Sequence, residues 1–309
     1  MTTCILLGPQ RPTINLGGAF DLLDGDRPVA VVSAGWQEVE EDIEHVRKVV
    51  PRSLVNLRLY GRAEEVFGRE TRLQEIYRER QDRLMELQRL HRYRLNSSML
   101  ATRRLLLEDN DTLMLRHEQR HAFSQQRALD KHHLQRIGAL HEDYEARIAE
   151  QVSPLLSEHI QEVAETIAGC DTVLITGGNV AILRNRLRLF RLDSLLASRN
   201  IVAWSAGAMV LADKVVLYHD NTPEGRRNAE VFDQGLGILG NVVLLPDAKH
   251  RLNAADRTRV ALFCRRFAPA ACLTLDSGSM LRFDDGRLSA ATGVRQLSRN
   301  GTLRKVRIR

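Results

Sequence analysis

One serine stands where an apolar segment meets a run of small residues. Residues 202–208 read Val-Ala-Trp-Ser-Ala-Gly-Ala, so Ser205 follows a predicted strand and opens a predicted helix. A nucleophilic serine needs such a turn, because small neighbours allow the tight bend and the hydroxyl then projects clear of the sheet. The N–H group of Ala206 would point toward a developing oxyanion. A serine that only caps a helix fits the same spacing, so both interpretations stay open here.

A second turn of the same kind lies upstream. Gly177, Gly178 and Asn179 follow the apolar segment 171–176 and precede a predicted amphipathic helix. In an open parallel sheet the carboxyl ends of the strands line the crevice where ligands bind. Glycine lets a backbone approach closely, so Gly177 or Gly178 could supply a second oxyanion donor. This second turn favours the catalytic interpretation of the serine.

The two turns together resemble the serine peptidases that include dipeptidase E and cyanophycinase. The resemblance continues through residues 235–246 and 275–279; it covers most of residues 153–290 and, more loosely, the first 60. It implies a flavodoxin-like α/β fold of the class I glutamine amidotransferase type, with a mostly parallel sheet flanked by helices. It also implies peptide-bond hydrolysis without a cofactor. Ser205 would attack, and the N–H groups of Gly178 and Ala206 would form the oxyanion hole.

The base that would activate this serine is less clear. The spacing of the family acid falls on Asp220. The family histidine would directly follow residue 246, where this chain has Asp247, and His250 comes three residues later. We predict His250 as the base and Asp220 as the residue that orients it, with Asp247 at the substrate. His219 is a weaker substitute for the base.

Two rival functions would use the same fold, and one of them is suggested by a departure from the family pattern. Asp247 at the expected histidine position would fit an inactive relative that keeps the fold as a binding module. Glutamine amidotransfer is disfavoured, because that chemistry needs a cysteine thiolate where this chain has Ser205. The aspartyl specificity of dipeptidase E is not expected here, since Val215 and Val216 stand where its arginine would be.

A third rival is a zinc hydrolase. Residues 117–121 read His-Glu-Gln-Arg-His, and His117, Glu118 and His121 match the zincin pattern, which sets two histidines and a glutamate on one helical face. A distant third ligand would come from His141, Glu142 or Glu145. The region is rich in arginine, glutamine, glutamate and histidine, so chance matches are frequent. We therefore favour a solvated helix face over a metal site.

The sequence pattern divides the chain into an α/β part and a helical insertion. Residues 1–68 and 151–309 alternate short apolar segments with turns, as βαβ units do. Residues 69–150 contain one glycine and no proline, and their leucines recur at near-helical spacing. We predict two or three long helices, folded into a hairpin by a turn at 96–98 or 108–112. The apolar stripe of such a hairpin needs a partner, either the α/β part or a second copy of the chain, and we expect a homodimer.

Composition narrows the class of protein further. The formal net charge is +6, yet aromatic residues make up only 5% and are not interleaved with basic blocks, so nucleic-acid binding is not expected. Membrane association is not expected either, because no apolar stretch approaches the roughly 20 residues that span a bilayer. Four scattered cysteines fit a reducing cytoplasm. The expected partner is a peptide or small amide substrate, and the charge is compatible with an acidic one.

Overall fold

The computed structural model describes residues 2–220 and 227–308, and its centre is a seven-stranded sheet in the order β11-β10-β1-β5-β4-β2-β3. The parallel strands are β1 (Thr3–Leu7), β2 (Val29–Val32), β3 (Leu54–Asn56), β4 (Thr172–Ile175) and β5 (Asn200–Trp204). β10 (Met280–Asp284) and β11 (Arg287–Thr292) add an antiparallel edge. The predicted α/β fold with a mostly parallel sheet is confirmed.

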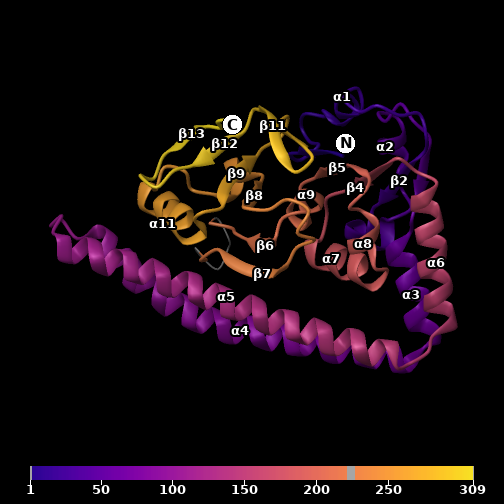
Figure 1. The fold of residues 1–309 in the computed structure, drawn as a ribbon, viewed down its shortest axis with the longest axis horizontal. Helices are drawn as coiled ribbons and strands as arrows, with labels where there is room; N and C mark the ends of the chain where they lie inside the picture. Colours follow the sequence, from indigo (N-terminus) through magenta and orange to yellow (C-terminus); the bar gives the residue numbers. More distant parts are fainter. Residues whose placement is uncertain (1, 221–226, 309) are drawn as a thin grey trace.

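Two smaller sheets continue the fold beside the central one. β8 (Val242–Pro246) and β9 (Ala271–Leu275) are parallel, and β12 (Arg295–Leu297) and β13 (Leu303–Lys305) extend that sheet in antiparallel fashion. β6 (Lys214–Leu217) and β7 (Glu230–Gln234) form an antiparallel ribbon. The ribbon lies between the α/β body and the long helices (Figure 1).

Helices cover both faces of the central sheet. The short ones are α1 (Leu16–Phe20), the 3-10 helix η1 (Ala34–Val39), α2 (Glu44–Arg47), α8 (Leu192–Leu195), α9 (Ala206–Val210) and α10 (Ala248–Arg251). The longer ones are α3 (Leu59–Arg69), α4 (Thr71–Leu107), α5 (Leu113–Ala149), α6 (Pro154–Ala168), α7 (Val180–Leu189) and α11 (Arg257–Phe267).

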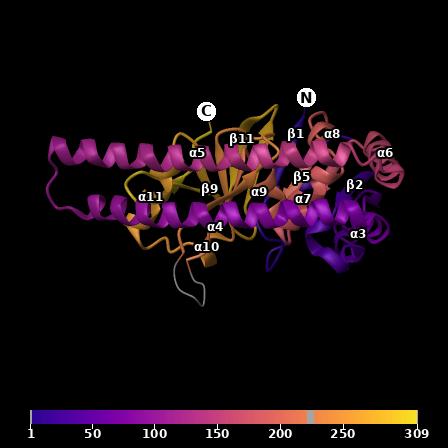
Figure 2. The same ribbon diagram turned by 90° about the horizontal axis from the view of Figure 1, so that it is seen from below.

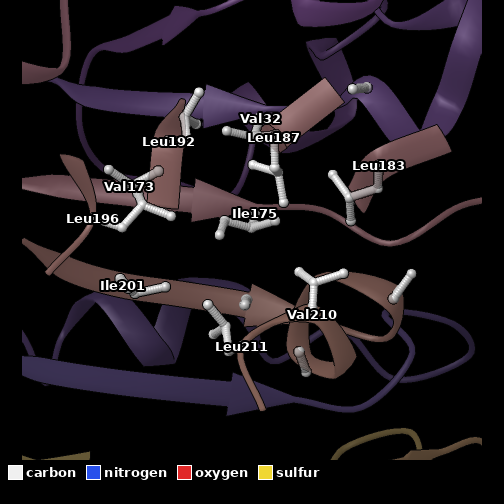
Figure 3. Packing of buried hydrophobic residues seen from close by; sticks show 14 of the residues in the cluster. Val32, Val173, Ile175, Leu183, Leu187, Leu192, Leu196, Ile201, Val210 and Leu211 are labelled. Atoms are coloured by element: carbon white, nitrogen blue, oxygen red, sulfur yellow. The ribbon is translucent and has the colours of Figure 1, made fainter. Parts of the chain in front are cut away.

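The strands are apolar on both faces, as expected for a parallel sheet that is covered on both sides. On one face, Val173, Ile175 and Ile201 belong to the same buried cluster as Leu183 and Leu187 of α7, and Figure 3 shows Ile175 beside Leu187. On the other face a separate cluster joins the alternate residues of the same strands to α1 and α2. This double cover fixes the strand ends, and the loops at those ends carry the candidate site.

The two longest helices, α4 and α5, form the hairpin. They lie side by side and antiparallel along one side of the body, and their connected tip projects beyond α11 (Figures 1 and 2). The chain turns at residues 108–112; the alternative turn at 96–98 was wrong. Ser97 and Ser98 remain helical, and the Ser97 hydroxyl donates to the carbonyl of Tyr93 one turn earlier. Of the helices in the described ranges, none is long and apolar enough to cross a membrane.

Candidate active site

The turn between β5 and α9 holds Ser205 in a conformation that few non-glycine residues adopt. Its φ is 49° and its ψ is −115°. Its N–H group donates to the carbonyl of Leu7 on the neighbouring strand β1, at 3.2 Å. The side chain makes no capping hydrogen bond to its own helix and is half-buried. Such strain persists only where the surroundings impose it, and it gathers at functional sites. A simple capping serine does not explain this geometry.

Small residues after Ser205 are required by the close approach of β4. A Cβ atom added at Gly207 would lie 2.3 Å from the carbonyl oxygen of Ile175 and 2.6 Å from that of Thr176. Any side chain at position 207 would therefore push the start of α9 away from the sheet. The sequence Ser-Ala-Gly-Ala thus matches a packing requirement of this turn.

The turn after β4 lies directly beside the serine. β4 and β5 are parallel neighbours, so their carboxyl ends meet at one edge of the sheet. A Cβ atom on Gly177 would lie 3.1 Å from the Cβ of Ser205. Gly178 has a φ of 110°, and a Cβ there would lie 2.3 Å from the carbonyl oxygen of Gly35. Three backbone segments converge here, which brings Gly177 and Gly178 to the serine.

Asn179 has a structural task in this arrangement. Its side-chain oxygen accepts the N–H groups of Ala181 and Ile182 and caps α7. Its own N–H group donates to the carbonyl of Gly35 at 2.8 Å. Both contacts hold the glycine turn in place, so Asn179 positions the turn.

Two clefts meet at Ser205. The larger has a volume of about 550 Å³ and the second about 540 Å³, and Ser205 and Gly178 line both. Polar residues that line the first cleft are Arg92, Tyr218, His219, Arg227, Asn228, Glu230, Asp247 and Arg251. The second has an aromatic and aliphatic wall that includes Trp36, Trp204 and Leu16, and its polar lining residues are Gln10, Arg11, Asp42 and His45. The serine therefore lies between a charged cleft and a more apolar one.

His250 forms a pair with Asp247, which lines the charged cleft. The His250 Nδ1 atom lies 2.6 Å from Asp247 Oδ1. Asp247 has a φ of 60° directly after β8, lines the cleft, and is approached by Arg251 Nε at 3.6 Å. The side chain of His250 is 71% exposed. Of the described carboxylates, Asp247 is the one placed to orient His250.

The N–H group of Asp220 donates to the carbonyl of Arg251, next to His250, at 2.8 Å, but its carboxylate contacts other residues. Its Oδ1 atom accepts a hydrogen bond from Arg259 at 2.6 Å, and Oδ2 accepts the N–H group of Asn253 at 2.8 Å. The pair with Arg259 is nearly fully buried, at 2% exposure for the aspartate side chain. The Asp220 carboxylate therefore ties α11 to the loop after β6, whereas the carboxylate that contacts His250 Nδ1 is that of Asp247 and not, as we had expected, that of Asp220.

Sequence reasoning missed several residues around Ser205. His219 lines the charged cleft together with Ser205, although we had ranked it below His250. His45 lines the second cleft, where its ring lies 5.0 Å from that of Trp36. Nothing in the local sequence around His45 marks it, because the contact depends on how η1 and α2 fold back over the sheet.

The histidines of the zincin pattern lie near the hairpin tip. His117, Glu118 and His121 are exposed on α5. Within residues 2–220 and 227–308, no group of three histidine, cysteine or acidic side chains is arranged to hold a metal ion. The pattern belongs to a solvated helix face, and the zinc hydrolase is not favoured.

The hairpin reaches the charged cleft through Arg92 of α4. Arg92 donates to both carboxylate oxygens of Glu230, at 2.7 and 3.0 Å, and Gln88 donates to Oε2 at 2.9 Å. Burial alone would raise the pKa of Glu230, but the hydrogen bonds from Arg92 and Gln88 hold it below its usual value. Glu230 is thus ionised and paired, and it forms the wall of the cleft where hairpin and ribbon meet.

Behind this wall lies a stacked histidine pair. The rings of His91 and His133 are 4.0 Å apart and nearly parallel, and both side chains are buried. His133 Nε2 lies 2.9 Å from Gln88 Oε1. Burial and the charge of neighbouring His91 lower the pKa of His133 to about 4, although Asp130 and Asp233 act in the opposite direction. His133 is therefore neutral at physiological pH.

This shift predicts acid sensitivity. Between pH 6.5 and about 4 the unfolded chain binds a proton at residue 133 that the folded chain does not, so stability falls as the pH falls through this window. The free energy of unfolding should fall in both proteins between pH 7 and pH 4.5, as measured by urea denaturation. We expect the fall in His133→Gln to be smaller than in the wild type by on the order of 2 kcal/mol. His132→Gln, an exposed neighbour on the same helix, is the control and should follow the wild type. Equal losses in all three proteins would contradict the assignment.

Comparisons with known proteins identify the family of the chain. A family profile described as Peptidase family S51 matches residues 126–291, more than half of the chain. Among solved structures, the chain is similar to a peptidase from an acI-B1 Actinobacterium, with 12% identity, 97% of this chain and 91% of that chain covered, and a TM-score of 0.45. It is also similar to a protein described as a peptidase E from Listeria monocytogenes EGD-e, with 11% identity, coverage of 96% and 100%, and a TM-score of 0.45. No curated protein matches the chain.

Proposed function

This chain belongs to peptidase family S51, and from that premise we propose that it is a serine peptidase whose nucleophile is Ser205. The observation that supports the nucleophile best is the strained turn at Ser205. Its φ of 49° is combined with a hydroxyl that makes no cap hydrogen bond, at the junction of two clefts. A residue held this way is exposed to a substrate and committed to no structural hydrogen bond within its helix.

In the proposed reaction, Ser205 Oγ attacks the carbonyl carbon of the scissile amide while a histidine takes its proton. The N–H groups of Ala206 and Gly178 stabilise the negative oxygen of the tetrahedral intermediate. The C–N bond then breaks, and the amine leaves with the proton that the histidine returns. Water, activated by the same histidine, hydrolyses the acyl-enzyme and restores the serine.

We assign the role of base to His250, oriented by Asp247 rather than Asp220. A base needs one ring nitrogen fixed by a carboxylate and the other free to accept a proton. The contact of 2.6 Å from His250 Nδ1 to Asp247 Oδ1 supports the first condition, and Nε2 would be the atom that takes the proton from Ser205. Because apo triads are often loose, the exposed ring would need to turn toward Ser205 on substrate binding.

The charged cleft supports an acidic or carboxylate-bearing peptide as substrate. Arg92, Arg227 and Arg251 line it, and guanidinium groups bind carboxylates bidentately. The acids Glu230 and Asp247 also line it, and each is already close to an arginine. A bound substrate carboxylate would share these arginines.

A fluorophosphonate probe tests the nucleophile directly, because it reacts with activated serines and needs no knowledge of the substrate. We expect it to label folded wild-type protein at Ser205, as located by mass spectrometry of the modified peptide. The Ser205→Ala protein and urea-unfolded wild type are the controls and should stay unlabelled. Failure to label the folded wild type would favour the inactive relative that serves as a binding module.

The same probe separates the two candidate bases. Loss of the general base should slow labelling by on the order of 10²–10⁴. We expect this for His250→Gln and also for Asp247→Asn, with His219→Gln close to the wild type. The reverse pattern, slow labelling in His219→Gln alone, would assign the base to the histidine that lines the cleft.

A further inference from the structure

A separate pocket lies between the hairpin and the body, on helices that do not hold the serine. Its volume is about 250 Å³, and it is bounded by α4, α5, α6, α7 and α8. Its charged lining comprises three arginines, Arg80, Arg188 and Arg191, and two acids, Glu145 and Asp193. Neither cleft at Ser205 shares a lining residue with this pocket.

Arg80 is a buried cation without a carboxylate partner. It is 3% exposed, and its guanidinium lies between the rings of Tyr77 and Tyr144, at 5.1 and 4.3 Å from their centroids. Its two terminal nitrogens contact neutral acceptors, His141 Nδ1 at 3.0 Å and Asn185 Oδ1 at 2.6 Å. Among the described residues no carboxylate lies within ion-pair range of Arg80. A buried charge in this position is costly unless an anion compensates it.

His141 cannot supply that compensation. Its Nε2 atom lies 2.8 Å from Asp233 Oδ1, so Nε2 donates its proton to the aspartate and Nδ1 accepts from Arg80. Burial keeps the pKa of His141 below its usual value, which agrees with a neutral ring. The charge of Asp233 therefore acts on Arg80 only across the His141 ring, without a direct contact.

Unpaired hydrogen-bond donors gather at the same pocket. Arg80 Nε, Arg188 Nε, Arg188 Nη2 and the hydroxyl of Tyr144 are all buried, and none has a hydrogen-bond partner within residues 2–220 and 227–308. Tyr144 is 5% exposed. Arg188 uses only Nη1, which donates to Glu145 at 3.0 Å. Buried donors are almost always satisfied in folded proteins, so several unsatisfied ones around one cavity indicate a missing acceptor.

The acids of the lining do not fill this need. Asp193 accepts both terminal nitrogens of Arg184, and Glu145 is held by Arg188 at the rim. The rest of the wall is apolar and is made by Tyr77, Ile148, Leu156, Ile160 and Leu189. The volume lies just below the roughly 300–1,000 Å³ typical of sites for drug-sized ligands. The pocket therefore suits a small molecule with an oxyanion at one end and a compact apolar body.

We propose that this pocket binds a small amphipathic anion, a carboxylate or phosphate monoester with a short branched apolar body, whose oxygens accept from Arg80, Arg188 and Tyr144. The apolar body lies against the side chains of α5 and α6. Because the donors that bind the anion come from the hairpin helices α4 and α5 and from α7 of the body, the anion joins the hairpin to the body.

Isothermal titration of the full chain with three matched probes tests the proposal. They are 3-methylbutanoate, isobutyl phosphate and the neutral 3-methylbutan-1-ol, in a buffer free of phosphate and carboxylates. We expect saturable binding of at least one anion and none of the alcohol; the anion that binds more tightly identifies the head group. Equal binding of the alcohol would overturn the role of the arginines. Binding of no probe would mean that water satisfies the donors, and would overturn the proposal.

Two variants locate the binding. Tyr144→Phe removes only the unpaired hydroxyl, and Arg188→Met keeps an apolar stem, so both should fold. Each should weaken anion binding by about tenfold or more, because hydrogen bonds to a charged ligand are among the strongest. Arg83→Met, an exposed arginine on the same hairpin, is the matched control and should bind as the wild type does. Unchanged affinity in both pocket variants would place the anion elsewhere and contradict the assignment.

Discussion

Replacing Ser205 with alanine is expected to lower kcat/KM by on the order of 10⁴–10⁶ without lowering stability. The loss follows from removing the nucleophile, since the oxyanion donors alone retain only a small part of the rate enhancement. Stability should hold because the hydroxyl makes no cap hydrogen bond and the alanine keeps the Cβ atom. The measurement is hydrolysis of a panel of aminoacyl p-nitroanilides, with thermal unfolding of both proteins recorded in parallel.

Ser205→Gly provides a sharper control. Glycine accepts a φ of 49° without steric cost, so this variant should be as inactive as the alanine variant and more stable by about 1 kcal/mol. If the turn at Ser205 is strained in the wild type, this variant should lose activity and gain stability. If Ser205→Ala kept a tenth or more of the wild-type rate, the assignment of the nucleophile would be wrong.

The two turns at the site could be predicted because their information is local. Apolar strands followed by Gly-Gly-Asn and by Ser-Ala-Gly-Ala each need small residues in sequence order, and parallel neighbours bring their ends together. What the sequence could not show is why the glycines are needed. Gly178 is pressed against the carbonyl of Gly35, a contact with a third loop more than 140 residues away in the chain.

The surroundings of the serine depend on long-range packing and were less predictable. The leucine spacing of the hairpin shows which face of each helix is apolar. It does not show that Arg92 of α4 contacts Glu230, which lies 138 residues further along the chain. Asp220 matched the spacing of the family acid, yet Arg259 of α11 lies 2.6 Å from it. The pairing of His250 with Asp247 was missed because we took Asp247 as a replaced histidine rather than as the carboxylate that orients one.

The second large effect concerns how the hairpin is attached. Asp130 of α5 accepts hydrogen bonds at 2.7 and 2.6 Å from Arg266 of α11, which is 1% exposed. Burial would raise the pKa of Asp130, but Arg266 and His91 hold it below its usual value, so the carboxylate is charged. Arg266→Met leaves this charge buried without its main partner. We expect a loss of about 3–5 kcal/mol in the free energy of unfolding, measured by urea denaturation at pH 7.

Two comparisons separate a buried pair from an ordinary arginine contact. Arg116→Met breaks a pair with Asp111 in which the two side chains are 57% and 71% exposed, and it should leave the free energy of unfolding close to that of the wild type. Adding Asp130→Leu to Arg266→Met removes the stranded charge and should recover much of the lost stability, because apolar replacements of a whole buried pair are often tolerated. If Arg266→Met cost no more than Arg116→Met, the hairpin would be held by its apolar contacts with Leu262 and the helix around it. The ion pair would then serve only to fix its register.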